Sequence, residues 1–224
     1  MSLNKFLAAA AAVVPVFIAS AANAALITDF SALATTNTTV TAFGPPGQYT
    51  SGYSQVITGS NPLAMTYNGS SGLYVDYNSS WGLGTNGDIV PGTPSMGINQ
   101  GGSLTFVLQN GPISGFGFLM NYAPGFGPVS ILALDASLNP FQTYDITTAA
   151  PIVGLPFQFR GIQDAAADIY GFELLAGPNS NASPLIDSIS YTAAITDVPV
   201  PEPMTIALVL SGLGAMGAVR RRKK

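Results

Sequence analysis

Short apolar runs broken by turn residues are the feature that most limits what this chain can fold into. From Ala25 to about Ala194, apolar and polar residues alternate, and Gly, Pro and Asn interrupt the alternation every few residues. Leu104, Phe106 and Leu108, for example, share one face of such a run. No long stretch of this region repeats apolar residues at every third or fourth position, as an amphipathic helix would. The pattern predicts an all-β fold, an antiparallel β-sandwich of the jelly-roll type.

Eleven runs have the length and residue types of strands, and turn signals such as Asn-Gly and Gly-Pro separate them. Asp135–Pro140 has the composition of a hairpin tip, and residues 59–102 are expected to contain long loops across one end of the sandwich. The predicted strands are Thr38–Phe43, Ser54–Ile57, Leu63–Tyr67, Leu73–Tyr77, Ser103–Leu108, Ile113–Tyr122, Val129–Asp135, Gln142–Thr147, Phe157–Ile162, Ile169–Leu175 and Leu185–Tyr191.

One of these runs has a face without side chains. Phe116 and Phe118 alternate with Gly115 and Gly117. Because glycine has no Cβ, this arrangement suits a close backbone approach or a β-bulge.

The body of the chain is almost without positive charge. Between Ala25 and Pro203 the only cation is Arg160, against eleven acidic residues, which gives a net charge of −10. Such a surface repels nucleic acid and anionic membranes, so neither is an expected partner of the body. We expect Arg160 to meet one of the carboxylates, either as a structural bridge or as a ligand-binding residue.

The composition removes most forms of catalysis. The chain has no His and no Cys, so Ser-His-Asp and Cys-His arrangements, disulfides and thiolate metal sites are excluded. A glycosidase or lyase that uses two carboxylates about 5–10 Å apart stays open as an alternative. Most candidate acids lie beside Gly, Asn or Ala, where Asp commonly stabilises turns, so we expect no enzyme. The candidates are Asp76, Asp88, Asp135, Asp145, Asp164, Asp168, Glu173 and Asp187.

Asp187 is a candidate for ligand binding because it shares strand parity with Leu185 and Ile189, which predicts that it points toward the core. A buried carboxylate needs partners. The simpler prediction is hydrogen bonds from the N–H groups of a neighbouring loop. The alternative is a calcium ion held with carbonyl oxygens and a second acid, Asp29 or Asp168. No other cofactor is expected.

Trp81 is the single tryptophan and lies in a Ser-Ser-Trp-Gly-Leu-Gly segment. An exposed aromatic ring beside polar residues could stack on a sugar, whereas a lone Trp in a domain of this size more often packs against a loop or the core. Both interpretations stay open.

Residues 1–24 have the parts of a secretory signal peptide. Lys5 supplies the positive charge, Phe6–Ile18 is apolar, and Ala22-Asn23-Ala24 satisfies the small-x-small cleavage rule. We therefore expect export through the Sec translocon, cleavage by signal peptidase after Ala24, and an ectodomain that spans residues 25–196.

Residues 197–224 have three parts in a fixed order. Pro201-Glu202-Pro203 lies in an extended segment. Met204–Val219 has no charge and predicts a transmembrane helix of about 24 Å, slightly short of the bilayer core of about 30 Å. A basic stop closes the chain and favours a cytoplasmic C-terminus; it consists of Arg220, Arg221, Arg222, Lys223 and Lys224.

This order of parts resembles the PEP-CTERM sorting signal of envelope proteins of Gram-negative bacteria. The resemblance implies that an exosortase, a membrane-embedded processing enzyme, recognises Pro201-Glu202-Pro203 and cleaves nearby. It also implies a precursor anchored in the inner membrane and a product at the cell surface or in the extracellular (biofilm) matrix. An ordinary tail anchor is the alternative, but it does not explain the Pro-Glu-Pro sequence.

The second half of the body carries another resemblance. The succession from Gly115-Phe116-Gly117-Phe118 to Ile186–Tyr191 is similar to the galactose-binding-like jelly rolls found before this signal. This similarity implies a fold rather than a ligand. The chain is thus expected to be an exported, non-catalytic surface or matrix protein. The alternatives are a carbohydrate-binding module associated with exopolysaccharide and, third, the carboxylate-dependent glycosidase or lyase.

Overall fold

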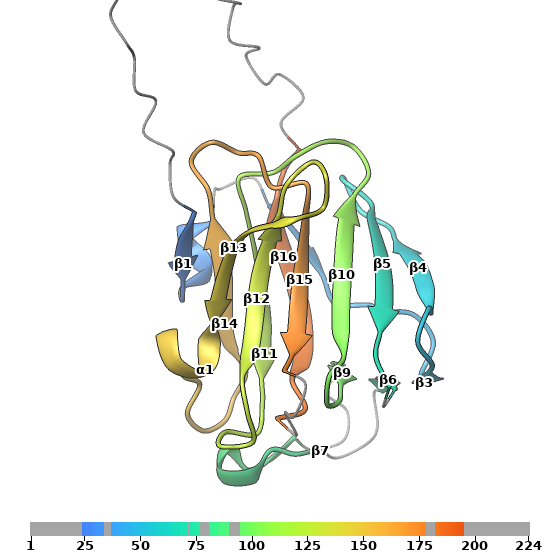
Figure 1. Ribbon diagram of the computed structural model, residues 1–224, viewed down its shortest axis with the longest axis vertical. Helices are drawn as coiled ribbons and strands as arrows, with labels where there is room; N and C mark the ends of the chain where they lie inside the picture. Colours follow the sequence, from blue (N-terminus) through green and yellow to red (C-terminus); the bar gives the residue numbers. More distant parts are fainter. Residues whose placement is uncertain are drawn as a thin grey trace, which may run out of the picture.

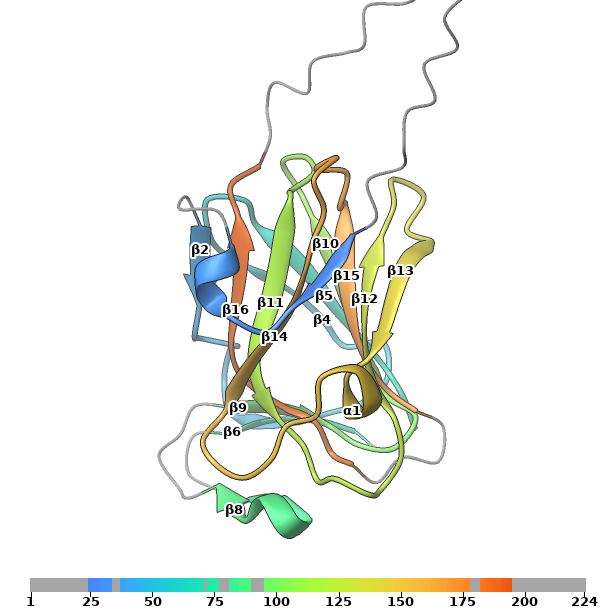
Figure 2. The ribbon, with the colours of Figure 1, turned by 90° about the vertical axis from the view of Figure 1, so that its left-hand side faces the viewer.

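The computed structural model describes residues 24–33, 37–70, 72–76, 81–89, 95–177 and 182–194. These residues form two antiparallel sheets that pack face to face (Figure 1, Figure 2). The predicted β-sandwich is therefore confirmed.

The larger sheet has eight strands, and its central strand is β16 (Leu185–Thr192). One side of β16 pairs with β11, and the other side pairs with β2 near its end and with β9 near its start. The sheet order is β1 (Ala25–Ile27), β14 (Gln158–Gln163), β11 (Gly115–Asn121), β16, β9 (Ser95–Ile98), β6 (Leu73–Asp76) and β3 (Gly47–Tyr49), with β2 (Asn37–Val40) beside β16.

The smaller sheet faces the viewer in Figure 1. Its order is β13 (Pro140–Asp145), β12 (Val129–Leu134), β15 (Gly171–Ala176), β10 (Ser103–Leu108), β5 (Leu63–Asn68) and β4 (Ser54–Ile57). Short elements complete the described fold: the pair β7 (Trp81–Gly82) and β8 (Asp88–Ile89), the 3₁₀ turns η1 (Phe30–Ala32) and η2 (Gly84–Asn86), and the helix α1 (Ile146–Ala149).

Aromatic rings join the two sheets in the core. Phe116 of β11 and Phe172 of β15 stack with ring centroids 4.4 Å apart and an interplanar angle of 10°. Phe106 of β10 also stacks on Phe172, at 5.1 Å, and Phe118 meets Phe106 at a tilted angle and Phe172 edge to face. All four rings are fully buried, and contacts of this kind contribute beyond the apolar area that they bury.

The bare face of β11 is used for close packing, as its glycines predict. A Cβ on Gly117 would lie 2.2 Å from the ring of Phe159, which covers it, and 2.9 Å from the carbonyl oxygen of Arg160. A Cβ on Gly161, opposite Gly117 in β14, would lie 2.3 Å from the carbonyl oxygen of Phe116. Because both positions are glycine, β11 and β14 can lie close together beneath the ring of Phe159.

Each of the eleven predicted strands coincides with an observed strand, with differences at the ends. The strand predicted as Thr38–Phe43 ends three residues earlier, at Val40. The strand predicted as Gln142–Thr147 ends at Asp145, whose carboxylate accepts a hydrogen bond from Thr147 N at 2.9 Å and caps α1. Asp135 also fits its prediction, since its Oδ1 accepts from the N–H groups of Ser137 and Asn139 in a hairpin tip.

The expectation of long loops across residues 59–102 is wrong in part. Strand β9 lies inside the larger sheet, between β16 and β6, and all four of its residues are buried. Met96 and Ile98, which enter the core, do alternate with Ser95 and Gly97, but the run is only four residues long and the Gly, Pro and Asn residues around it are typical of a loop.

The first and last strands of the described chain, β1 and β16, bring both chain ends to the same end of the larger sheet. Ala25 pairs with Gln163, which also pairs with Gly115, and the neighbouring residue Phe116 pairs with Tyr191. The predicted signal sequence before Ala24 and the predicted helix of residues 204–219 lie outside the described residues. Within them, no helix has the length and apolar character needed to cross a membrane.

Candidate functional site

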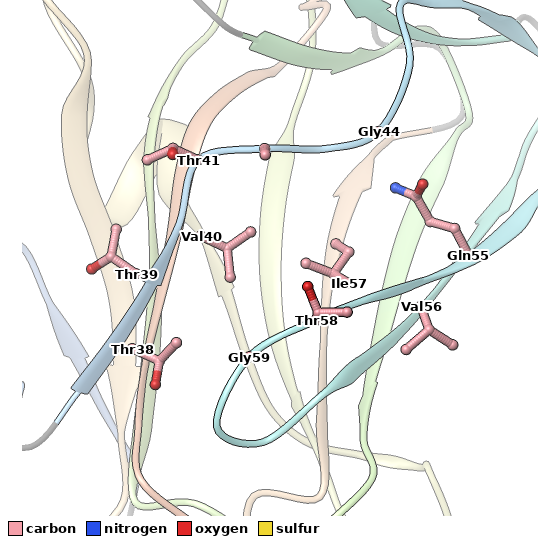
Figure 3. A pocket seen from close by; sticks show the side chains of 11 residues that line it. Thr38, Thr39, Val40, Thr41, Gly44, Gln55, Val56, Ile57, Thr58 and Gly59 are labelled. Carbon is pink, nitrogen blue, oxygen red and sulfur yellow. The ribbon is translucent and has the colours of Figure 1, made fainter.

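A groove of about 500 Å³ runs between β2 and β4, where the edges of the two sheets come together (Figure 3). Val40 and Ile57 are buried and lie between the two strands, while Thr41 and Thr58 are exposed. The lining residues are Thr38, Thr39, Val40, Thr41, Ala42, Gly44, Gln55, Val56, Ile57, Thr58 and Gly59.

Hydroxyl and amide groups line the groove together with the apolar side chains of Val40, Ala42, Val56 and Ile57, and none of the lining side chains is charged. Gln55 is fixed in place: its Nε2 donates to the carbonyl oxygen of Phe43 at 2.6 Å, and its Oε1 accepts from Tyr53 OH at 3.1 Å. Thr39 Oγ1 lies 3.0 Å from Ser190 Oγ in β16. The groove therefore offers a neutral surface in which part of the polar groups is pre-positioned.

Backbone groups add to this surface. Among the described strands, β2 pairs only with β16, and β4 pairs only with β5. Each strand consequently has one side without a strand partner in the described fold, and such a side offers N–H and C=O groups to a ligand.

A second cavity, of about 260 Å³, lies beside the loop of residues 150–157. Asn86 holds this loop from inside, since its Nδ2 donates to the carbonyl oxygen of Ile152 at 3.3 Å and its Oδ1 accepts from Gly154 N at 2.8 Å. The same Nδ2 donates to Asn121 Oδ1 at 2.8 Å and to the carbonyl oxygen of Tyr122 at 2.9 Å. This amide network stabilises the loop, and Asn86 also contributes to the lining of the cavity.

Arg160 belongs to the same loop anchor. It is 5% exposed, and its guanidinium donates from Nε to the carbonyl oxygen of Ala150 at 2.6 Å and from Nη2 to that of Pro151 at 2.8 Å. Further bonds reach the carbonyl oxygen of Phe159 and Gln158 Oε1. Within the described residues Arg160 contacts no carboxylate, so the expected ion pair is wrong: the loop carbonyls replace it.

Asp187 is the extra residue of a β-bulge. Leu119 pairs with Ser188, whereas the next residue, Met120, pairs with Ile186. Asp187 was expected to point toward the core because it alternates in step with Leu185 and Ile189. The bulge interrupts this alternation, so that Ile186 enters the core and Asp187 stays half-buried. Burial raises the pKa of the Asp187 carboxyl. No group of three or more acidic side chains among the described residues could hold a metal ion, and calcium at Asp187 remains a prediction.

Trp81 pairs with Ile89 through the backbone of β7 and β8, and it is not among the residues that line the groove. Its stacking on a sugar therefore stays a prediction.

Of the candidate acids, Asp164 and Asp168 lie close together in the turn after β14, because the Asp164 carboxyl raises the pKa of Asp168 to about 6. Two carboxyls so close together leave no space for a glycosidic bond between them, which requires a separation of about 5 Å or more. Glu173 lies on the outer face of the smaller sheet beside Thr105 and Leu132, opposite its core-facing neighbours, as its parity predicts.

Sequence reasoning did not find the groove. Thr38–Thr41 and Thr58 belong to residue types that are common on any exposed strand, and only the meeting of β2 with β4 makes them one surface. The buried amides were missed as well: Asn86 because Asn beside Gly was interpreted as a turn signal, and Asn121 because it lies inside the predicted strand Ile113–Tyr122.

The comparisons with known proteins place a signal at the C-terminus. Residues 199–223 match the PEP-CTERM protein-sorting motif. This confirms the predicted sorting signal and marks the chain as an exported, membrane-anchored precursor that an exosortase sorts to the cell surface. Pro201-Glu202-Pro203 and the basic stop lie outside the described residues. No curated protein matches the chain.

Three solved structures with some likeness are sugar-binding domains. A family 29 carbohydrate-binding module has 19% identity and a TM-score of 0.32, covering 63% of this chain and 97% of that one. A variant of CBM29-2 with cellulohexaose has 19% identity and a TM-score of 0.33, covering 58% and 92%. The lectin-binding domain of Lectinolysin with Lewis b has 6% identity and a TM-score of 0.31, covering 45% and 71%. TM-scores this low carry no argument about this chain.

Proposed function

We propose that this chain is a non-catalytic β-sandwich protein that an exosortase cleaves near Pro201-Glu202-Pro203 and that then remains at the cell surface or in the extracellular matrix. The match of residues 199–223 to the sorting motif carries this proposal. The body is the cargo of the signal, and the chain is the substrate of the processing reaction rather than its agent. Signal peptidase and the Sec translocon act on the other end.

Three features support a non-catalytic body. The chain has no His and no Cys. Arg160 is occupied by backbone carbonyls. Asp164 and Asp168, which lie close together among the described residues, are outside the groove. A carboxylate-dependent glycosidase or lyase is accordingly the least supported of the three alternatives.

Mass spectrometry of the C-terminus of the surface-located protein tests the processing step. In the wild type the basic stop, Arg220–Lys224, should be missing, whereas Glu202→Ala should keep it and accumulate in the inner membrane. Asp197→Ala removes an acid that precedes the motif and should be processed like the wild type. An intact basic stop on the surface-located wild-type protein would refute the proposal.

A second candidate function is the binding of a neutral polysaccharide, such as exopolysaccharide, in the groove between β2 and β4. The uncharged lining, in which hydroxyl and amide groups stand beside apolar side chains, favours it, because a neutral polysaccharide needs hydrogen-bond partners and apolar contact but no counter-charge. Affinity electrophoresis in gels that contain the cell's own polysaccharides tests this function. Thr41→Arg and Thr58→Arg, which fill the groove from exposed positions, should abolish retardation, whereas Thr143→Arg on the far edge should not.

Trp81→Ala tests in the same gels whether Trp81 contributes as a stacking platform. Lost retardation would support that role. If the wild-type protein migrates alike in all gels, the polysaccharide function is excluded while the sorting proposal stands.

A further inference from the structure

A smaller pocket, of about 230 Å³, lies on the outer face of the larger sheet. The residues of this face alternate along β11 and β16 with core residues such as Phe118 and Ile189, which are fully buried on the opposite face. We call this space the outer pocket. Its lining residues are Phe30, Thr39, Leu119, Phe159, Ser188 and Ser190.

Strand pairing sets the floor of the outer pocket. Leu119 of β11 pairs with Phe159 of β14 on one side and with Ser188 of β16 on the other. Two residues further along β16, Ser190 pairs with Thr39 of β2, and their hydroxyl oxygens lie 3.0 Å apart. The floor is thus fixed by four strands of one sheet and does not depend on the conformation of a loop.

Phe30 supplies an exposed aromatic ring at the rim. Its side chain is 44% exposed, and its ring meets the buried ring of Phe159 edge to face, with centroids 5.7 Å apart. The side chain of Asp29 caps the turn η1 in which Phe30 lies. Leu33, at the other end of the turn, is buried, and its side chain would lie 3.0 Å from a Cβ on Gly115. The ring of Phe30 is therefore held in place before any ligand arrives.

The outer pocket continues the groove between β2 and β4. Thr39 lines both spaces. In Figure 3 its side chain lies on the opposite side of β2 from that of Val40, which points toward Ile57 across the groove. A linear ligand in the groove consequently reaches the outer pocket by crossing a single strand.

The lining of the outer pocket indicates the class of ligand. Aromatic and aliphatic side chains stand beside three hydroxyl groups, and none of the lining side chains is charged. A neutral pyranose fits this combination, because its C–H face can pack on a ring while its hydroxyls bond to those of the floor. A charged sugar would lose water there without a counter-charge. Since a cavity of about 150 Å³ holds benzene, the outer pocket has space for one sugar ring.

We propose that the outer pocket binds one neutral sugar unit and that Phe30 is the ring on which this unit stacks. The unit belongs to the polysaccharide that lies in the groove, so this role of Phe30 rests on the polysaccharide function proposed above. Binding then extends over both sides of β2, from the hydroxyl and amide groups of the groove to an aromatic platform on the outer face.

Affinity electrophoresis of the full chain in detergent, in gels that contain the cell's own polysaccharides, measures the apparent dissociation constant. Phe30→Ala should raise it by about 5–10-fold, since the stacking surface is lost. Phe30→Trp should leave it unchanged or lower it, because a larger ring still stacks. Phe141→Ala removes a ring of similar exposure from β13, an edge strand of the other sheet, and should bind like the wild type. Equal midpoints of thermal unfolding for Phe30→Ala and Phe141→Ala show that lost binding is not lost folding.

Tryptophan fluorescence gives a second measurement. In Phe30→Trp, the polysaccharide should move the emission to shorter wavelength by more than it does in the wild type, whose only tryptophan is Trp81. Thr41→Arg, which fills the groove, should abolish this change.

The outcomes separate the two proposals. If the wild type is retarded and Phe30→Ala is retarded equally, the groove binds polysaccharide alone and the role of Phe30 is wrong. An emission of Phe30→Trp that changes no more than that of the wild type would overturn it as well. If the wild type is not retarded in any gel, the polysaccharide function fails and the role of Phe30 fails with it.

Discussion

Arg160 Nε donates to the carbonyl oxygen of Ala150 over 2.6 Å, and this bond ties the only cation of the body to a loop instead of to a carboxylate. Arg160→Met should lower the free energy of unfolding by about 3 kcal/mol or more, because it leaves buried carbonyl oxygens without donors. Arg160→Lys keeps the charge but not the planar donor geometry and should recover at most about 1 kcal/mol of that loss. Urea unfolding of the purified chain measures both.

Gln158→Ala is the comparison variant for Arg160: it removes one acceptor of the guanidinium and one bond of its own to the loop, at the carbonyl oxygen of Val153, and should cost about 1 kcal/mol. Equal losses for Arg160→Met and Gln158→Ala would contradict the idea that the arginine anchors the loop.

Asn86 should tolerate no change of its amide into a carboxylate. In Asn86→Asp an oxygen replaces Nδ2 and faces Asn121 Oδ1 and the carbonyl oxygens of Tyr122 and Ile152. The buried charge and the lost donors should cost at least about 3 kcal/mol in urea unfolding. Asn68→Asp, at an exposed position, should change stability by less than about 0.5 kcal/mol. A small effect at Asn86 would show that the network contributes little.

Gly161→Ala should disrupt the contact between β14 and β11. The new Cβ would lie 2.3 Å from the carbonyl oxygen of Phe116 and 2.9 Å from Gly117 Cα, and both are backbone atoms that cannot turn aside. We expect a loss of about 3 kcal/mol, or failure to fold. Gly47→Ala meets only Tyr49 at an ordinary 3.5 Å and should be neutral or slightly stabilising. Thermal unfolding of both variants measures the difference. If Gly161→Ala and Gly47→Ala unfold at the same temperature, the close approach of β14 to β11 does not limit the side chain at Gly161.

Glu173 should make stability depend on pH. Burial raises its pKa above the ordinary value of 4.5, so the folded state holds this proton more tightly than the unfolded state does. Its contribution is complete below pH 4.5 and is lost as the pH rises through the folded-state pKa. Glu173→Gln should therefore stabilise the chain at pH 7 and have little effect at pH 3.5, as measured by urea unfolding at both values. A stabilisation that is equal at both would rule out the titration of Glu173 as its cause.

Tyr144 OH donates to the carbonyl oxygen of Ala24 at 2.8 Å, and Ala24 is the residue after which we expect signal peptidase to cleave. Cleavage there removes this acceptor. Tyr144→Phe should thus leave the mature protein within about 0.5 kcal/mol of the wild type, but lower the stability of a chain that keeps Ala24 by about 1 kcal/mol. N-terminal sequencing, together with urea unfolding of both forms, tests this. A mature N-terminus before Ala24 would correct the predicted cleavage site.

Alternation was sufficient to predict the strands that have one buried and one exposed face. Leu104, Phe106 and Leu108 enter the core as their spacing predicts. The same rule could not find β9, because that strand is only four residues long and lies among residues typical of a loop, and it misplaced Asp187, because a single extra residue in β16 reverses the parity between the two parts of the strand. Bulges and the pairing of so short a strand are set by neighbours that are distant in sequence, and periodicity does not record them.

The functional sites also differ in how far the sequence alone predicts them. The sorting signal was predictable because its parts follow one another along the chain. The groove depends on two sheet edges that meet only in the folded chain. The closeness of Asp164 and Asp168 depends on the turn after β14. Counting charges predicted that Arg160 would find an acid, yet the fold placed it among loop carbonyls, which satisfy a guanidinium equally well by geometry.

Strand β16 is the last described strand before the sorting motif, and it is hydrogen-bonded along both sides in the middle of the larger sheet. This position matters once the chain is held by its C-terminal end and the cell is exposed to flow. A pull along the axis of β16 loads its hydrogen bonds to β11 and β2 together, in shear, whereas the edge strand β1 is bonded to β14 alone. In the membrane-anchored precursor, tension on the C-terminal end would therefore reach the sandwich through a strand that is held on both sides.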